Sequence, residues 1–309
     1  MINKRYSGRR GFDRNHVRHF SALHALLLFT TTLLIASISP LWSQQFTTTV
    51  RSDFDGAAKD ASLTTVSPNF DVFQEREELL YEVSYLGIKL GSISTRIVSV
   101  TPGDQGLRIK VEGLVRTYKG VPFVTLNTLY RSVIGESLSS VSFTNKEYLS
   151  SHGVYKYIEY VYATDKDRVY VHETVERHPS WEKHDTLTLD GQRWQDGLSL
   201  FYYARAFSHS NRSRDIPVLM YRDKATTSIR FGVANERVSI DAADYRVHCR
   251  KLEGETGFTG IFGLTGAFEG WFSDDSAAIP IRAKMHVLIG SVKIELIKWK
   301  RRGWRPPQH

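Results

Sequence analysis

Cysteine is nearly absent from this chain, because Cys249 is the only one among 309 residues. A single thiol excludes an internal disulfide, and no cysteine stands near the N-terminal apolar run, where a bacterial lipid anchor would need one. We expect Cys249 to be a small buried strand residue rather than a reactive thiol. The fold then depends on its hydrophobic core alone.

The chain also lacks the short motifs of common enzyme classes. It has no Gly-x-Ser-x-Gly elbow, no Walker motif and no dinucleotide-binding glycine motif. Its densest group of histidines and acids does not match the i, i+4 histidines of a helical zinc site or a thiolate set. That group contains His172, Glu173, Glu176, His178, Glu182, His184 and Asp185. We therefore expect no cofactor and no metal, although missing motifs do not exclude an enzyme.

Basic residues crowd the N-terminus ahead of an apolar run from Leu23 to Ile38. They are Lys4, Arg5, Arg9, Arg10, Arg14 and Arg18, against the single acid Asp13. This layout predicts a signal peptide over residues 1–43 and export to the periplasm or cell envelope. The alternative is an inner-membrane anchor formed by residues 22–42. Much of the formal charge of +8 belongs to this leader, so the charge does not indicate a nucleic-acid partner.

The remainder divides into three parts by composition. Residues 44–69 are rich in Thr, Ser, Ala and Asp without periodicity, which predicts a flexible linker. Residues 70–300 alternate apolar and polar side chains and are numerous enough for a single β-rich domain. Residues 301–309 predict a basic disordered tail, with contact to an anionic membrane surface as the alternative.

Alternation predicts mostly antiparallel strands through this domain. Glu78 to Val100 is typical of two paired strands, and a second pair is expected at 154–162 and 169–175. Further strands are expected at 218–221, 226–233, 236–240, 245–252, 282–289 and 292–297. The predicted fold is all-β, a curved sandwich, half-barrel or barrel with one covering helix. That helix is Asp196 to Phe207, with Asp196 as its cap and Leu198, Phe201 and Tyr202 facing the sheet.

Glycines recur at every third position from Gly254 to Gly266, and apolar side chains lie between them. Such a segment offers bare backbone to a ligand or lipid, or else folds back onto the core as a hairpin. The candidate ligand or partner contacts are Phe258, Ile261, Phe262, Leu264 and Trp271.

Asp274 and Asp275 form the most suggestive acid pair in the chain. They follow an aromatic strand end and precede Ile279-Pro280, where acids commonly accept hydrogen bonds from their own turn. We expect a structural turn there. The alternative is an acid pair for general acid–base work.

Four segments resemble those of a bacterial family of exported proteins, domain-of-unknown-function family 3108. They are Leu80 to Lys89 with Gly91, Asp196 to Arg205, Tyr245 to Cys249, and Phe268 to Val292, which is the most specific. The resemblance implies an envelope-located, β-rich domain and supplies no catalytic residues. We expect a non-catalytic protein that binds an envelope lipid, glycan or protein, and the alternative is a periplasmic hydrolase using Asp274 and Asp275.

Overall fold

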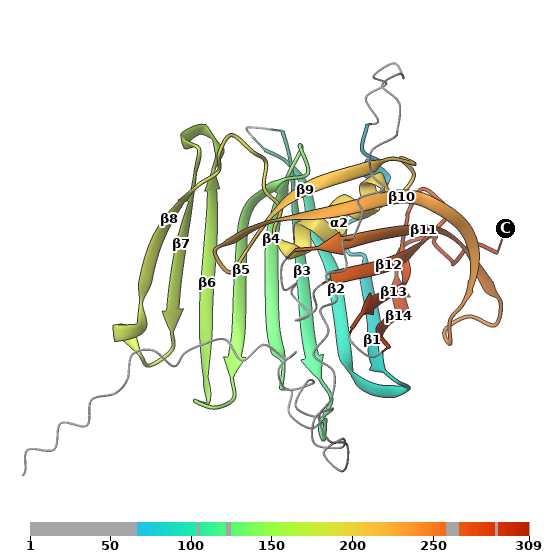
Figure 1. Cartoon of the computed structure of the whole chain (residues 1–309), viewed down its shortest axis with the longest axis horizontal. Coiled ribbons are helices and arrows are strands. Elements are labelled where there is room, and N and C mark those ends of the chain that lie inside the picture. The colour runs from blue at the N-terminus through green and yellow to red at the C-terminus, as the bar shows by residue number, and fades with distance from the viewer. Residues whose placement is uncertain (1–66, 104–105, 122–124, 258–265, 288–289, 309) are drawn as a thin grey trace, which may run out of the picture. The chain divides into compact units, whose positions relative to one another are not determined.

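A computed structural model describes residues 67–103, 106–121, 125–257, 266–287 and 290–308, and these form one large antiparallel sheet with a helix against it (Figure 1). The first strands are β1 (Glu78–Tyr85), β2 (Ile88–Gly103), β3 (Gly106–Thr117), β4 (Asn127–Gly135), β5 (Ser140–Leu149), β6 (Val154–Ala163), β7 (Arg168–Val175) and β8 (Lys183–Thr188). The later strands are β9 (Ser213–Met220), β10 (Asp223–Ser239), β11 (Arg246–Thr256), β12 (Gly266–Ser273), β13 (Pro280–His286) and β14 (Ser291–Lys300). The helices are α2 (Gly197–Phe207) and the 3-10 turns η1 (Phe70–Val72), η2 (Thr164–Lys166) and η3 (Pro179–Trp181).

In the described part of the chain, strands that follow one another in the sequence are neighbours in the sheet, except that β1 pairs with β14 and β8 does not pair with β9. Neighbours run from β8 down to β1, then from β14 down to β9, so the first and last strands pair at the centre of the sheet. Every ladder between neighbouring strands is antiparallel, as the alternation predicted. No ladder joins the edge strands β8 and β9 within the described residues, and the connection between them contains α2. The all-β prediction with one covering helix is therefore confirmed, as an open curved sheet.

The sheet bends so that its two halves face each other. Figure 1 shows β9 to β12 crossing the face of β2 to β5, with α2 between the two layers. The helix contacts β3 and β4 on one side and β9 on the other. A hydrophobic core lies between the layers, and residues of both halves contribute to it. A strand such as β3 shows how, because Ile109 and Val111 are buried on one face while Lys110 is exposed on the other.

The helix α2 begins directly after Asp196, the residue predicted to cap it. Asp196 accepts hydrogen bonds from the backbone amides of Leu198 and Ser199, each at 2.8 Å, and the Ser199 hydroxyl completes a capping box. Leu198 and Tyr202 are fully buried, as predicted. Phe201 is half-buried, because its ring reaches a cavity that the helix does not fill.

Side chains rather than backbone ladders connect the distant ends of the sheet. The β9–β10 turn has positive φ at Tyr221 and Arg222, 49° and 72°, as a tight two-residue hairpin requires. It directs Arg222 to Glu173 of β7 at 3.1 Å and to Asp185 of β8 at 3.3 Å. These ion pairs hold the two halves of the sheet together at this end.

The predicted leader and most of the predicted linker lie outside the described residues. The C-terminal end differs from its prediction, because residues 301–308 pack against the domain instead of forming a disordered tail. Arg301 pairs with the buried carboxylate of Glu77 at 2.5 Å, and the Trp304 indole donates to Asp275 at 2.8 Å. The carbonyl of Pro307 accepts from the amide of His248 at 2.8 Å. Partners far away in the sequence therefore hold Arg301, Trp304 and Pro307 in place, while Arg302 and Arg305 remain exposed.

Candidate functional site

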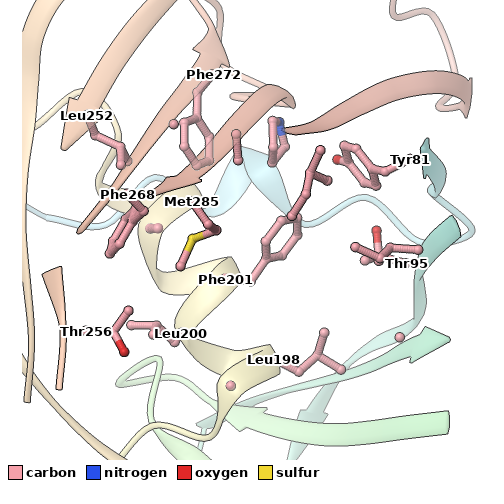
Figure 2. Close-up of a pocket in the computed structure, with 18 of the residues that line it drawn as sticks. Tyr81, Thr95, Leu198, Leu200, Phe201, Leu252, Thr256, Phe268, Phe272 and Met285 are labelled. Atoms are coloured by element: carbon pink, nitrogen blue, oxygen red, sulfur yellow. The ribbon is translucent and has the colours of Figure 1, made fainter. Parts of the chain in front are cut away.

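An apolar cavity of about 200 Å³ lies between the two halves of the sheet, beside α2. Its walls come from β1 to β4 on one side and β10 to β14 on the other, with the helix between them. Figure 2 shows side chains of both halves and of the helix around this space. Its principal apolar side chains are Leu198, Phe201, Leu252, Phe268, Phe272 and Met285.

Strand alternation and two glycines shape the cavity. On β12, Phe268, Gly270 and Phe272 are spaced two apart and all line it, as residues on one face of a strand do. A Cβ atom at Gly270 would lie 3.1 Å from both Leu252 and Phe272, and one at Gly113 would lie 3.2 Å from Leu198. Glycine at these positions therefore lets the strands and the helix approach as closely as they do.

Three neutral hydroxyl groups interrupt the apolar lining. The hydroxyls of Tyr81, Thr95 and Thr227 are buried and have no hydrogen-bond partner among the described residues. Burial raises the pKa of the Tyr81 hydroxyl well above its usual value, so this group remains a neutral donor. An unpartnered buried hydroxyl costs free energy, and a ligand with a polar atom would recover part of that cost.

The charged residues at the edge of the cavity are already paired. Glu269 contacts Lys251 at 2.5 Å, and Arg282 contacts Glu295 at 2.7 Å. These ion pairs leave the apolar surface and the hydroxyls as the groups available to a ligand.

The glycine-rich candidates Phe258, Ile261, Phe262 and Leu264 lie outside the described residues. Trp271 is described, and it is not among the residues that line the cavity. Its indole donates to Glu236 at 2.7 Å, and Lys251 and Lys284 lie 5.4 Å from its ring. Trp271 thus sits in a cation–π arrangement on the side of β12 away from Phe272.

The two acids of the Asp274-Asp275 pair have different environments. One oxygen of Asp275 accepts from the Ser273 hydroxyl and from the amides of Ala277 and Ala278, at 2.9 to 3.1 Å. Its other oxygen accepts from Trp304. Both oxygens of Asp275 therefore accept hydrogen bonds, one from the turn between β12 and β13 and the other from Trp304.

Asp274 lies among basic side chains on the surface. It contacts Arg250 at 3.0 Å, His209 at 3.2 Å and His248 at 3.4 Å. Neither Asp274 nor Asp275 lines the cavity. The structure therefore separates the acid pair from the apolar cavity beside α2.

Cys249 is buried in β11 and is not paired with another cysteine. Burial raises the pKa of its thiol to about 12, so the thiol stays protonated and unreactive at neutral pH. The pattern around Cys249 predicted this strand position, whereas the cavity was not predicted. Its lining is assembled from strands that are distant in the sequence, such as β1, which carries Tyr81, and β13, which carries Met285.

Among the described residues, no helix has the length and apolar character needed to cross a bilayer.

Solved structures of low sequence identity resemble the chain. One is a beta-barrel-like protein of domain of unknown function DUF1849 from Brucella abortus, with a TM-score of 0.48, 9% identity, and 73% of this chain and 97% of that chain covered. Another is a protein with a YmcC-like fold from Bacteroides fragilis, with a TM-score of 0.34, 12% identity, and coverage of 76% and 98%. No curated protein matches the chain. A family model described as protein of unknown function (DUF3108) matches residues 80–297, so the chain belongs to that family and the resemblance in its sequence is confirmed.

Proposed function

We propose that the domain is an exported, non-catalytic protein that binds an apolar ligand, the acyl chain of an envelope lipid, in the cavity beside α2. The apolar lining supports this proposal most directly, because side chains such as Phe201, Phe268 and Met285 offer contact area and few polar groups. Clefts of this composition are the usual sites for apolar small molecules. Burial of acyl methylene groups among these side chains would supply the binding free energy.

The lining favours a lipid over a glycan. A buried glycan brings many hydroxyl groups, each of which needs a hydrogen-bond partner to offset its desolvation. Among the described residues that line the cavity, only Tyr81, Thr95 and Thr227 have unpartnered polar atoms, their hydroxyls. Those three match a ligand with one small polar group and a long apolar portion.

The size of the cavity limits what it encloses. Its volume of about 200 Å³ exceeds the roughly 150 Å³ of a dry cavity that holds benzene, and falls short of the roughly 300 to 1,000 Å³ of a drug-sized pocket. We infer that part of an acyl chain is enclosed while the remainder of the lipid stays outside.

Displacement of a fluorescent fatty acid, cis-parinaric acid, tests the proposal. Ala283 of β13 lines the cavity, so Ala283→Phe should fill it and weaken binding at least about tenfold through lost volume. Ala267 of β12 is exposed, and Ala267→Phe is the matched control that should bind like the parent. Equal affinity in all three proteins would place the binding elsewhere, and mass spectrometry of lipids that co-purify with the parent identifies the natural ligand.

The hydrolase alternative receives less support. Asp275 accepts four hydrogen bonds from its own turn and from Trp304, and Asp274 is surrounded by Arg250, His209 and His248. Neither carboxylate faces the cavity where an apolar substrate would lie. We infer that Asp275 stabilises its turn and that Asp274 forms ion pairs with the neighbouring basic side chains.

Export is supported by the basic N-terminal residues and the apolar run from Leu23 to Ile38. N-terminal sequencing of the protein from the envelope fraction is expected to show that residues 1–43 have been removed. A chain that begins at Met1 and resists carbonate extraction would instead support an anchor at residues 22–42.

A further inference from the structure

A histidine on β7, a histidine on β8 and a glutamate that directly precedes β8 meet at one edge of the sheet. His172 and His184 are direct partners in the register between these strands, and Glu182 precedes His184 by two residues. The Glu182 carboxylate lies 2.8 Å from Nε2 of His172 and 3.3 Å from Nε2 of His184. One possible ligand atom from each residue falls within 4.8 Å of the others.

The backbone explains why the sequence spacing did not predict this cluster. Residues two apart in an extended segment share a face, so Glu182 and His184 point to the same side. The ladder then places His172 opposite His184, and the two rings stack with centroids 4.3 Å apart. The loop that contains η3 closes the hairpin and brings together residues that are ten positions apart.

Packing of the turn itself does not use the cluster. His178 stacks on Trp181 with ring centroids 4.5 Å apart, and His152 meets Trp181 edge-on at 5.5 Å. These contacts hold the hairpin end independently of His172 and His184. Replacement of His172, Glu182 or His184 should therefore leave the ring contacts at the hairpin end intact.

The other acids nearby are held by cations. Asp185 contacts Arg222 at 3.3 Å, and Glu173 contacts Lys156 at 3.2 Å and Arg222 at 3.1 Å. Glu182 contacts only the two imidazoles among the described ion pairs. The cluster is thus a defined set of two imidazole nitrogens and one carboxylate.

This donor set suits a transition-metal ion. Two imidazoles and one carboxylate are the protein ligands of several zinc sites, with water in the fourth position. Ligand atoms around a tetrahedral zinc ion lie about 3.3 Å apart, since the bonds are about 2.0 to 2.1 Å long. The distance from Glu182 to His184, 3.3 Å, matches that spacing, and the distance to His172, 2.8 Å, is shorter, so His172 would move slightly outward on binding an ion. The side chains are 40% to 71% exposed, which leaves room for a water ligand.

We propose that His172, Glu182 and His184 form a binding site for a divalent transition-metal ion, with Zn²⁺ as the reference ion. A bound ion would bridge β7 and the exposed edge strand β8 and stabilise their pairing. Imidazole donors select Zn²⁺, Cu²⁺ or Ni²⁺ over Mg²⁺.

Calorimetric titration of Zn²⁺ into the untagged, chelator-treated full chain tests the site. We expect saturable binding of about one ion per chain at this site, and weakening by at least about tenfold in both His184→Ala and Glu182→Gln. His286→Ala is the matched control, because His286 is an exposed histidine of β13 that lies outside the cluster and outside its hairpin, and this variant should bind Zn²⁺ like the parent.

Three results would overturn the proposal. They are the absence of saturable Zn²⁺ binding, unchanged binding in both His184→Ala and Glu182→Gln, and Mg²⁺ binding as tight as that of Zn²⁺. Thermal melting without metal serves as the check on folding, and Glu182→Gln retains the size of the side chain if His184→Ala melts early. Added Zn²⁺ should raise the melting temperature of the parent and not that of Glu182→Gln.

Discussion

Arg205 of α2 and Glu77, which precedes β1, form an ion pair that is closed to solvent. Its two nitrogen–oxygen distances are 2.6 and 3.0 Å, and the side chains are 0% and 1% exposed. Arg301 from the C-terminal segment reaches the same carboxylate at 2.5 Å. The carboxylate therefore joins the helix, the start of the sheet and the C-terminal end of the chain, which are far apart in sequence.

Replacing Glu77 by glutamine is expected to lower the free energy of unfolding by about 3 to 5 kcal/mol. The reason is that the guanidinium of Arg205 would remain buried beside Arg301 without a negative partner. Urea unfolding measures the loss.

Glu112 provides the matched control for that change. It also contacts two arginines, Arg96 at 2.7 Å and Arg131 at 2.8 Å, but both arginines are at least half exposed. Glu112→Gln should therefore cost less than about 1 kcal/mol. Equal, small losses in the two variants would show that burial does not strengthen the Glu77 contacts.

Asp196 should give the protein an unusual dependence on pH. It is fully buried, and burial raises the pKa of its carboxyl above the ordinary value of 3.8 despite hydrogen bonds from Ser132 and Ser140. The folded state then binds the proton more tightly than the unfolded state. This contribution to stability is present below the unfolded pKa and is lost as pH rises through the folded pKa.

Asp196→Asn isolates that contribution, because the other titrating groups are common to both proteins. Asparagine retains an acceptor for the amides of Leu198 and Ser199 and has no charge. Stability of the parent minus that of Asp196→Asn should fall as pH rises from about 4 toward neutral, measured by urea unfolding at each pH. A difference that grows over this range would mean that the hydrogen bonds outweigh burial.

Local patterns predicted those elements whose side chains alternate or cap clearly. Glu78 to Val100 predicted β1 and β2, and Asp196 predicted the start of α2. The segments 226–233 and 236–240 were predicted as separate strands but form one strand, β10, because a register shift between Arg230 and Ala234 interrupts the alternation without ending the strand. Edge strand β8 gave no signal, since nearly all of its residues are exposed.

The cavity and the C-terminal contacts could not be predicted in the same way. Tyr81, Phe201 and Met285 line one space only after β1 has paired with β14 and the sheet has folded over the helix. Arg301 looks like part of a solvated basic tail until Glu77, more than two hundred residues away, supplies a buried partner. Such pairings depend on tertiary structure, and neither periodicity nor composition reports them.

Two substitutions of Asp275 distinguish the hydrogen bonds that its two carboxylate oxygens accept. Asp275→Ala removes an acceptor for Ser273, Ala277 and Ala278 and should cost about 1 to 3 kcal/mol. Asp275→Asn should cost less, because its oxygen can keep those three bonds. Its amide group, however, faces the indole N–H of Trp304, and two donors cannot bond each other.

A double-mutant cycle measures that last effect. In a Trp304→Phe background the indole donor is absent, so Asp275 and its Asn variant should unfold at nearly the same urea concentration. If the Asn variant is equally destabilised in both backgrounds, the contact with Trp304 does not contribute to the stability of the turn.

A substitution of Thr227 tests whether the cavity is dry, through its effect on the free energy of unfolding. Its hydroxyl is fully buried, lines the cavity and has no hydrogen-bond partner within the part of the chain that the structure describes. Thr227→Val replaces this hydroxyl by a methyl group of similar size, so the ligand-free protein should gain up to about 1 kcal/mol in urea unfolding. Thr117→Val is the matched control, since the Thr117 hydroxyl bonds the backbone of Leu126, and it should lose about 1 kcal/mol. A loss in Thr227→Val as large as that in Thr117→Val would mean that the Thr227 hydroxyl is bonded in solution, by an enclosed water or by a retained ligand, and that the cavity is not dry.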